Sequence, residues 1–456
     1  MNAVLVGVLV YVLAQLLIGV LVSRRVTTQA DYLLAGRSLG HTLTTFTLFA
    51  TWFGAETCIG SAGAVYREGL SGGSADPFGY ATCLLLMGWV FAVPLWRRQL
   101  TTLADLFRTR YATGVERLAV LMMVPASVMW AAAQIRAFGQ VLSVSSDLSV
   151  TMAVTIAAAA VIVYTVCGGL LADVITDLIQ GIVLIIGLTV LLLAVAQNAG
   201  EVAAAFASIA PERLRIFGGS DASISLVLET WAIPVCGSVI SQELAARVIA
   251  ARSPQVARQA CLLAGSIYLL VGIIPVFLGF VGVTLLPNLE HPEQILLLMA
   301  QRYLSTFSYT LFAGALVSAI LSTVDSALLA AASLVSQNLL VSAYPEMSEA
   351  GKVRVARVGV TVFGVLAYFL ALHTEGVYKL VEDASAFGGA GIFIIVVFGL
   401  FTQFGGARSA CAALVVGMAV WLYGTYVAAF EVAYLASLLA ALIAYLTVAL
   451  VEKMLL

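Results

Sequence analysis

Residues 49–66 read FATWFGAETCIGSAGAVY, and this short stretch decides how the whole chain is interpreted. It lies among long apolar blocks, yet it carries the carboxylate of Glu56 and three glycines, Gly54, Gly60 and Gly63. A segment inside a bilayer must satisfy its own backbone hydrogen bonds, and ionisable groups at that depth are costly and usually functional. The stretch therefore predicts a membrane helix that is interrupted beside a binding site.

The composition places the chain in a membrane. Of the 456 residues, 62% are hydrophobic and only 10% are charged, whereas soluble domains carry roughly 25% charged residues. Apolar blocks of about 20 residues, the length that crosses a bilayer, recur from end to end. The first block has no basic residue before it, so we interpret it as a retained helix and not as a cleaved signal. An all-α polytopic membrane protein is predicted.

The apolar blocks predict thirteen spans and one membrane domain that covers residues 1–456. The segment 291–305 is predicted to be a short surface helix. The predicted spans are 2–22, 41–66, 77–96, 118–144, 150–166, 173–196, 224–246, 260–286, 306–340, 353–372, 376–401, 408–428 and 432–452.

Two of these spans carry helix breakers. The second, 41–66, contains the three glycines, and the seventh, 224–246, contains Pro234 and Gly237. Broken helices at corresponding positions of two halves are the best sequence indication of a transporter's binding site. Their offset of five spans predicts a five-plus-five inverted repeat. The alternative is that Gly and Pro are simply common in membrane helices.

The basic residues predict the orientation of the chain. Most of its 22 Lys and Arg residues, including Arg24, Arg25 and Arg247, fall in loops that share one side if the N-terminus is outside. By the positive-inside rule the N-terminus is expected outside and the C-terminus inside. A plasma membrane is the expected location, or the inner membrane if the source is bacterial.

Several classes of function are disfavoured. The six cysteines show no CxxC spacing and the three histidines are scattered, so no disulfide framework, metal centre or haem is expected. There is no GxxxxGK[ST] phosphate-binding loop, which argues against an ATP-driven pump. The chain has no run of basic residues interleaved with aromatic ones, so nucleic-acid binding is not indicated. We therefore expect that the protein is not an enzyme and that it has neither an organic cofactor nor an obligate protein partner.

The intramembrane ionisable residues divide into two groups. Asp173, Glu229, Glu382 and Asp383 lie near predicted helix ends, where a carboxylate reaches water, so a structural interpretation is favoured. Glu56, Asp177 and Asp325 lie deeper or within dense polar motifs, so a functional interpretation is favoured.

The ninth predicted span contains VSAILSTVDSALLAAASLVSQN (317–338). Ser322 and Thr323 stand side by side near Asp325, and hydroxyl oxygens with freed carbonyls suit a monovalent cation. The alternative is a plain packing face of small residues.

At this point the chain resembles the sodium/solute symporter family, which includes sodium/proline, sodium/galactose and high-affinity choline transporters. The resemblance covers most of the chain and implies a leucine-transporter type of fold that works by alternating access. One extra helix (1–40) would precede the two repeats (41–200 and 220–405), and two extra helices (406–456) would follow them. The motifs that carry it are DYLLAGRSLG (31–40), ATWFGAETCIGSAGAVY (50–66), YTVCGGLLADVITDLIQG (164–181), AARVIAARSP (245–254) and SAILSTVDSALLAAAS (318–333).

The resemblance also implies ligands for sodium, the expected coupling ion. They are the backbone carbonyls of Ala50, Phe53 and Ala319 and the hydroxyls of Ser322 and Thr323. Asp177 matches an acidic residue that family members place along the inner ion path, so it is a candidate for that path or for a second sodium ion.

The expected substrate site leaves the charge of the solute open. Trp52 and Trp130 stand where choline-type members carry tryptophans, whose faces attract quaternary ammonium. Ser241 replaces an aromatic residue of those members. Arg136 would repel a bare cation and bind a carboxylate, or else form a structural ion pair with Glu56, Glu243 or another carboxylate. The full expected set is Trp52, Glu56, Trp130, Arg136, Ser241 and Gln242, with Asp325 adding negative potential nearby.

The sequence thus predicts a sodium-coupled symporter that imports a small organic solute, whether amino acid, betaine, amine or organic acid. The alternative is a membrane solute sensor of the same fold that binds without transporting. The chain ends at EKMLL without an appended signalling domain, so such a sensor would need a partner.

Overall fold

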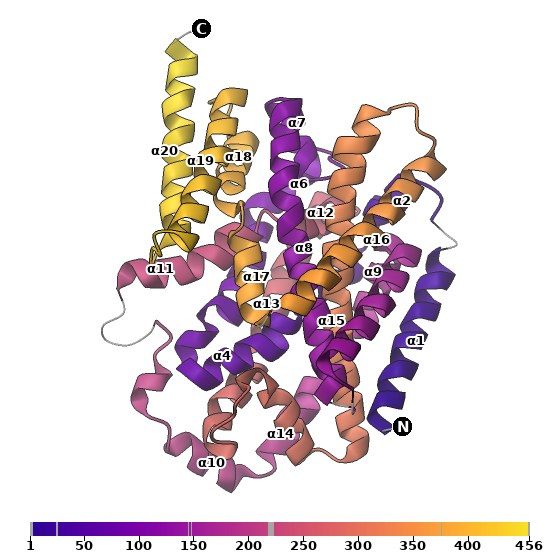
Figure 1. Ribbon diagram of the computed structural model, residues 1–456, viewed down its shortest axis with the longest axis vertical. Coiled ribbons are helices and arrows are strands. Elements are labelled where there is room, and N and C mark those ends of the chain that lie inside the picture. Colours follow the sequence, from indigo (N-terminus) through magenta and orange to yellow (C-terminus); the bar gives the residue numbers. More distant parts are fainter. Residues whose placement is uncertain are drawn as a thin grey trace.

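The computed structural model describes residues 3–23, 26–144, 146, 148–217, 223–374 and 376–454. These residues form helices and no strand; an isolated bridge joins Leu39 and Ala251. The helices run mostly along the long axis of the molecule, and the two termini lie at its opposite ends (Figure 1). An odd number of membrane crossings would place the termini in this way.

The α-helices account for nearly all of the predicted spans. In chain order they are α1 (Ala3–Ser23), α2 (Gln29–Leu34), α3 (His41–Trp52), α4 (Ser61–Glu68), α5 (Tyr80–Leu86), α6 (Ala92–Arg97), α7 (Ala104–Arg110), α8 (Thr113–Val144), α9 (Val150–Ala196), α10 (Ala199–Ala207), α11 (Ile224–Ala232), α12 (Gln242–Ala250), α13 (Pro254–Leu285), α14 (Ile295–Tyr303), α15 (Thr306–Val335), α16 (Glu349–His373), α17 (Val377–Ala386), α18 (Gly389–Phe401), α19 (Ala407–Tyr426) and α20 (Ala433–Met454).

Short segments of other helical geometry connect them. The π-helical segments are η2 (Glu56–Gly60), η4 (Ser74–Gly79), η5 (Met87–Phe91), η7 (Ile233–Gly237) and η9 (Ser336–Val341), and the 3₁₀ turns are η1 (Ala35–Arg37), η3 (Leu70–Gly73), η6 (Pro211–Leu214) and η8 (Pro292–Gln294).

The number of membrane spans stays a prediction. Within the described residues, 8 helices are long and apolar enough to cross a membrane, or up to 10 if each of two bent pairs is one span. The predicted total of thirteen also counts α1, the broken pair α3 and α4, and the two halves of α9 separately. Because length and composition do not decide those three cases, only the range is established.

The break predicted in span 41–66 is confirmed. Helix α3 ends at Trp52, Phe53 leaves helical geometry with φ −84° and ψ 65°, and the chain resumes as η2 and α4. A Cβ added at Gly54 would lie 2.6 Å from Thr323 Oγ1 and 2.7 Å from Glu56 Oε2. Only glycine fits here, so the break lets α15 approach the backbone of the first core helix.

The break predicted in span 224–246 is also confirmed, and the structure adds a third. Helices α11 and α12 are separated by η7 and bent by 45°, and α17 and α18, predicted as one span, are bent by 42°. Ser238 in the first of these breaks donates a hydrogen bond to Ser385 beside the other, at 3.2 Å. The two breaks therefore meet inside the bundle.

The structure bears on two local expectations. The predicted spans 150–166 and 173–196 are the two parts of α9, which meet at a kink at Gly169. The short helix predicted within 291–305 is α14, which packs against α13 and α15 and has Leu296 and Met299 on its buried face.

The turn inside α9 gives a test of the fold. Gly169 has φ 59° and ψ −172°, a region open to little but glycine, and an added Cβ would lie 2.5 Å from the ring of Tyr32. We expect Gly169→Ala to destabilise the protein by about 1–3 kcal/mol, seen as a lower melting temperature in detergent. The control is Gly314→Ala in α15, where no atom lies within 4 Å of the added Cβ. Equal melting temperatures for the two variants would contradict this account.

Candidate functional site

A cavity lies where three broken helices meet α8. The space between its walls, part of which is open to solvent, is about 520 Å³. We call it the chamber. Its lining residues are Trp52, Met123, Ala126, Ser127, Trp130, Gly237, Ser238, Ile240, Ser241, Gln242, Glu243, Ala384, Ser385, Phe387, Gly389 and Ile392.

Two tryptophans form one wall of the chamber. The rings of Trp52 and Trp130 meet edge to face, with centroids 5.2 Å apart and planes at 77°. Glu56 lies behind them: Trp130 Nε1 donates to Glu56 Oε1 at 3.3 Å, and Gln134 Nε2 donates to Glu56 Oε2 at 2.6 Å. Glu56 borders a separate, smaller cavity with Tyr80 and other residues. In this structure Glu56 positions Trp130 and does not line the chamber.

Another part of the chamber wall is the start of α12. Ser241 is the N-cap residue, and its hydroxyl accepts from Leu244 N; Gln242 Oε1 accepts from Leu103 N at 2.8 Å. Glu243 is 3% exposed, and its Oε1 accepts from Ser127 Oγ of α8 at 2.6 Å. The structure therefore brings together Trp52, Trp130, Ser241 and Gln242 from the predicted set and adds Glu243.

Arg136 lies elsewhere. It lines a second cavity with Arg67, Glu290, His291 and Glu293, and its Nη1 donates to the carbonyl of Ala371 at 3.1 Å. Among the described residues no ion pair within 4.0 Å joins Arg136 to a carboxylate, so the expected pairing with Glu56 or Glu243 is not found.

Asp325 also faces away from the chamber. Its Oδ1 accepts from Thr165 Oγ1 of α9 at 2.5 Å, and it is 1% exposed. It therefore belongs to a buried polar network and does not add its charge to the chamber wall.

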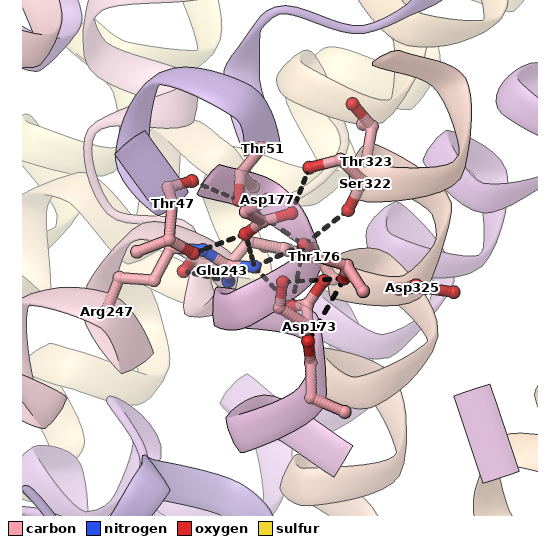
Figure 2. A network of polar contacts seen from close by, with 12 residues as sticks. Thr47, Thr51, Asp173, Thr176, Asp177, Glu243, Arg247, Ser322, Thr323 and Asp325 are labelled. Atoms are coloured by element: carbon pink, nitrogen blue, oxygen red, sulfur yellow. Dashed lines mark hydrogen bonds and ion pairs between the residues drawn. The ribbon is translucent and has the colours of Figure 1, made fainter. Parts of the chain in front are cut away.

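That network is centred on Arg247 of α12 (Figure 2). Arg247 is 1% exposed, and its Nη2 lies 2.6 Å from Asp173 Oδ2 and 3.7 Å from Asp177 Oδ2, both on α9. Its Nε donates to Thr47 Oγ1 of α3 at 3.0 Å, and its Nη2 also donates to Ser326 of α15. One guanidinium thus ties four helices together.

This corrects two expectations. The side chain of Asp173 does not reach water but forms an ion pair inside the bundle. Arg247, which was counted among the loop residues, is also buried there. Arg24 and Arg25 from the same count lie outside the described residues. Glu229 does have a structural role: it accepts from the backbone N–H groups of Tyr434 and Leu435, at 2.7 and 2.8 Å, and so caps α20.

The segments that carry the predicted sodium ligands meet next to this network. Helices α3 and α15 pack against one another, and the cradle at Gly54 is faced by the oxygens Thr323 Oγ1, Glu56 Oε2 and Gln134 Oε1. Thr323 Oγ1 donates to the carbonyl of Ala319 at 3.2 Å, and Ser322 donates to Asp177. Hard oxygen atoms in this number are suited to an alkali cation. The described residues hold no cluster of three or more His, Cys, Asp or Glu that could bind a metal.

A second carboxylate, which the sequence patterns do not single out, supports the break of α3. Asp76 is fully buried; its Oδ2 accepts from Thr57 Oγ1 at 2.8 Å, and its Oδ1 lies 3.0 Å from the hydroxyl of Tyr268. That hydroxyl is also 3.2 Å from the carbonyl of Trp52. An acidic residue inside the predicted span 77–96 would have indicated a functional group, but Asp76 lies one residue before that span.

Comparison with known proteins identifies the family. The model of the sodium:solute symporter family matches residues 32–417. The chain belongs to this family. Among curated proteins, the high-affinity choline transporter 1 of Caenorhabditis elegans is 28% identical over 77% of this chain and 63% of its own length. The sodium/pantothenate symporter of Escherichia coli K12 is 26% identical over 85% of this chain and 82% of its own length.

Solved structures confirm the fold. A sodium-coupled sialic acid symporter in a substrate-bound outward-open state superimposes with a TM-score of 0.83 at 18% identity, over 98% of this chain and 97% of that one. Mhp1, a nucleobase-cation-symport-1 family transporter, gives 0.61 at 16% identity over 91% and 92%. The predicted class, an all-α membrane protein of the leucine-transporter type, is confirmed. The boundaries of the repeats stay predictions.

The Arg247 network allows a test of its role in stability. Removing one partner of a buried ion pair leaves an uncompensated charge and costs about 3–5 kcal/mol. We expect Arg247→Gln to lower the melting temperature strongly, and the double variant Arg247→Gln with Asp173→Asn to recover part of the loss.

The control for this test is Lys352→Gln, which removes the exposed pair with Glu349 at 2.7 Å and should cost at most about 1 kcal/mol. A double variant less stable than Arg247→Gln alone would show that the charge of Asp173 is not what the arginine compensates.

Proposed function

We propose that this protein is a sodium-coupled symporter that imports a small organic solute by alternating access. One observation carries the proposal: the break of α3 borders both candidate sites. Trp52 lines the chamber, and Gly54, two residues on, lies against Thr323 of α15. A solute and an ion that each order the same few residues make each other's binding more favourable, which is the coupling that symport needs.

The proposed sodium ligands are the carbonyls of Ala50, Phe53 and Ala319 and the hydroxyls of Ser322 and Thr323. These are uncharged oxygens, which suit a sodium ion that binds and leaves in each cycle. Asp177 is proposed as the next point on the inner ion path, or as part of a second sodium site. The composition of the network supports this role, because it holds three carboxyl groups, those of Asp173, Asp177 and Asp325, and one guanidinium, that of Arg247.

The relatives do not agree on the charge of the solute. Choline carries a quaternary ammonium, whereas pantothenate carries a carboxylate, and the transporters of both are about equally similar to this chain. This chain also spans 63% of the length of the worm choline transporter. The lining of the chamber, mostly apolar with a few polar side chains, supports a small organic solute.

We propose that the protein is a multi-pass protein of the plasma membrane, or of the inner membrane in a bacterium, with the N-terminus outside and the C-terminus inside. The bias of Lys and Arg supports this orientation by the positive-inside rule, even after Arg247 is removed from the loop count.

The sodium site is tested by Ser322→Ala together with Thr323→Ala. We expect the loss of sodium-dependent uptake in proteoliposomes, because both side-chain ligands of the ion are removed while α15 keeps its small-residue packing. The assay compares uptake of each of a set of amino acids, betaines, amines and organic acids under a sodium gradient and under a potassium gradient.

The matched control is Ser333→Ala on the same helix, whose hydroxyl bonds to the carbonyl of Ala330 at 2.8 Å and which should keep its sodium dependence. Unchanged sodium dependence in the double variant would rule out this site. A solute that the wild-type protein binds equally well in sodium and potassium, without uptake, would favour the sensor.

A further inference from the structure

We propose that Glu243 makes the chamber selective for solutes that bear a cationic nitrogen and no net negative charge. This inference rests on the proposed function, because it takes the chamber as the solute site. It assigns to Glu243 the role of counter-charge, and it decides between the two solute charges that the relatives leave open.

The first support is that the carboxylate of Glu243 forms no direct ion pair, although the charge of Arg247 acts on it from one turn away. Its carboxylate accepts a hydrogen bond from Ser127 at 2.6 Å and is also bonded by the side chain of Ser241. Arg247 is one turn away on α12, but its guanidinium binds the carboxylate of Asp173 at 2.6 Å and only the backbone carbonyl of Glu243, at 3.1 Å. In the described part of the chain no ion pair within 4.0 Å involves the Glu243 carboxylate.

The second support is the rest of the lining. The chamber is bordered by a single carboxylate, that of Glu243, and by no Lys, Arg or His within the described residues. A carboxylate that is 3% exposed is costly to keep unpaired away from water. A solute cation would remove that cost, whereas a solute anion would meet like charge and no cationic side chain.

The third support comes from the two tryptophans of the chamber wall. The faces of Trp52 and Trp130 attract cations through their ring quadrupoles, and both rings line the chamber. Trp52 Nε1 is buried and has no hydrogen-bond partner among the described residues. A hydroxyl or carbonyl oxygen on the solute would satisfy this donor, so an ammonium group with an oxygen a few bonds away fits the chamber best.

The arrangement also explains why Arg136 does not argue for an anionic solute. Its guanidinium lies in the second cavity, with Glu290 and Glu293, and not among the lining residues of the chamber. The charge that a bound solute meets is therefore that of Glu243.

The test uses the purified full-length protein in sodium buffer and measures ligand binding by thermal stabilisation. The probes are choline, its uncharged carbon analogue 3,3-dimethylbutan-1-ol, glycine betaine, proline, ethanolamine, acetate and pantothenate. We expect the tightest-binding probe to carry a cationic nitrogen. In Glu243→Gln its Kd should rise at least tenfold, while the Kd of 3,3-dimethylbutan-1-ol should stay within twofold.

Two further variants separate charge from structure. Glu243→Asp keeps the charge and should retain more of the preference for cationic nitrogen than Glu243→Gln does. Glu382→Gln removes a carboxylate that borders the smaller cavity and not the chamber, and it should leave the Kd of every probe unchanged. These variants also keep the test informative if Glu243→Gln folds poorly.

The proposal is overturned if pantothenate or acetate binds tightest, if no probe with a cationic nitrogen binds, or if Glu243→Gln and the wild-type protein bind the best probe equally. These failures differ from a failure of the proposed function. Sodium-coupled symport would be refuted if uptake by the wild-type protein did not depend on the sodium gradient. Sodium-dependent uptake of an anion would refute only the proposed role of Glu243.

Discussion

The backbone that leaves the helix after Trp52 sets the requirements for everything around it. Inside a membrane protein no bulk water is at hand, so the N–H and C=O groups freed there need partners within the bundle. Gln134 Oε1 accepts from Ala55 N at 2.9 Å, and the hydroxyl of Tyr268, held by Asp76, lies 3.2 Å from the carbonyl of Trp52. These buried side chains make the break a fixed structure, and the carbonyls near it become available to a cation.

The charged groups near that break differ in how they are compensated. Arg247 pairs with Asp173 and Asp177, and this pairing joins α3, α9, α12 and α15 (Figure 2). Glu243, which lines the chamber, accepts a hydrogen bond from Ser127 and forms no ion pair within 4.0 Å among the described residues. The difference is informative because a paired buried charge is compensated within the protein, whereas an unpaired one favours the binding of an opposite charge.

The broken helices show how far pattern alone can go. Glycine and proline coincide with the breaks in spans 41–66 and 224–246, yet Pro125 and Pro275 lie inside the continuous helices α8 and α13. The break between α17 and α18 also contains glycines, Gly388 and Gly389, whereas Gly169 kinks the long helix α9. A local signal of the same kind therefore has different outcomes, which depend on what packs against it.

The sequence by itself determined that this is an all-α membrane protein with two broken core helices, and it identified residues of the family's motifs. Hydropathy, helix breakers and motif spacing are local properties that can be read along one chain. Only the tertiary structure decided that Arg247 is buried, that Arg136 and Glu56 lie outside the chamber and that Glu243 lines it. Whether a buried carboxylate meets a guanidinium, a hydroxyl or a cavity depends on which helices face it. That is a property of packing between distant segments, and no periodicity along the chain encodes it.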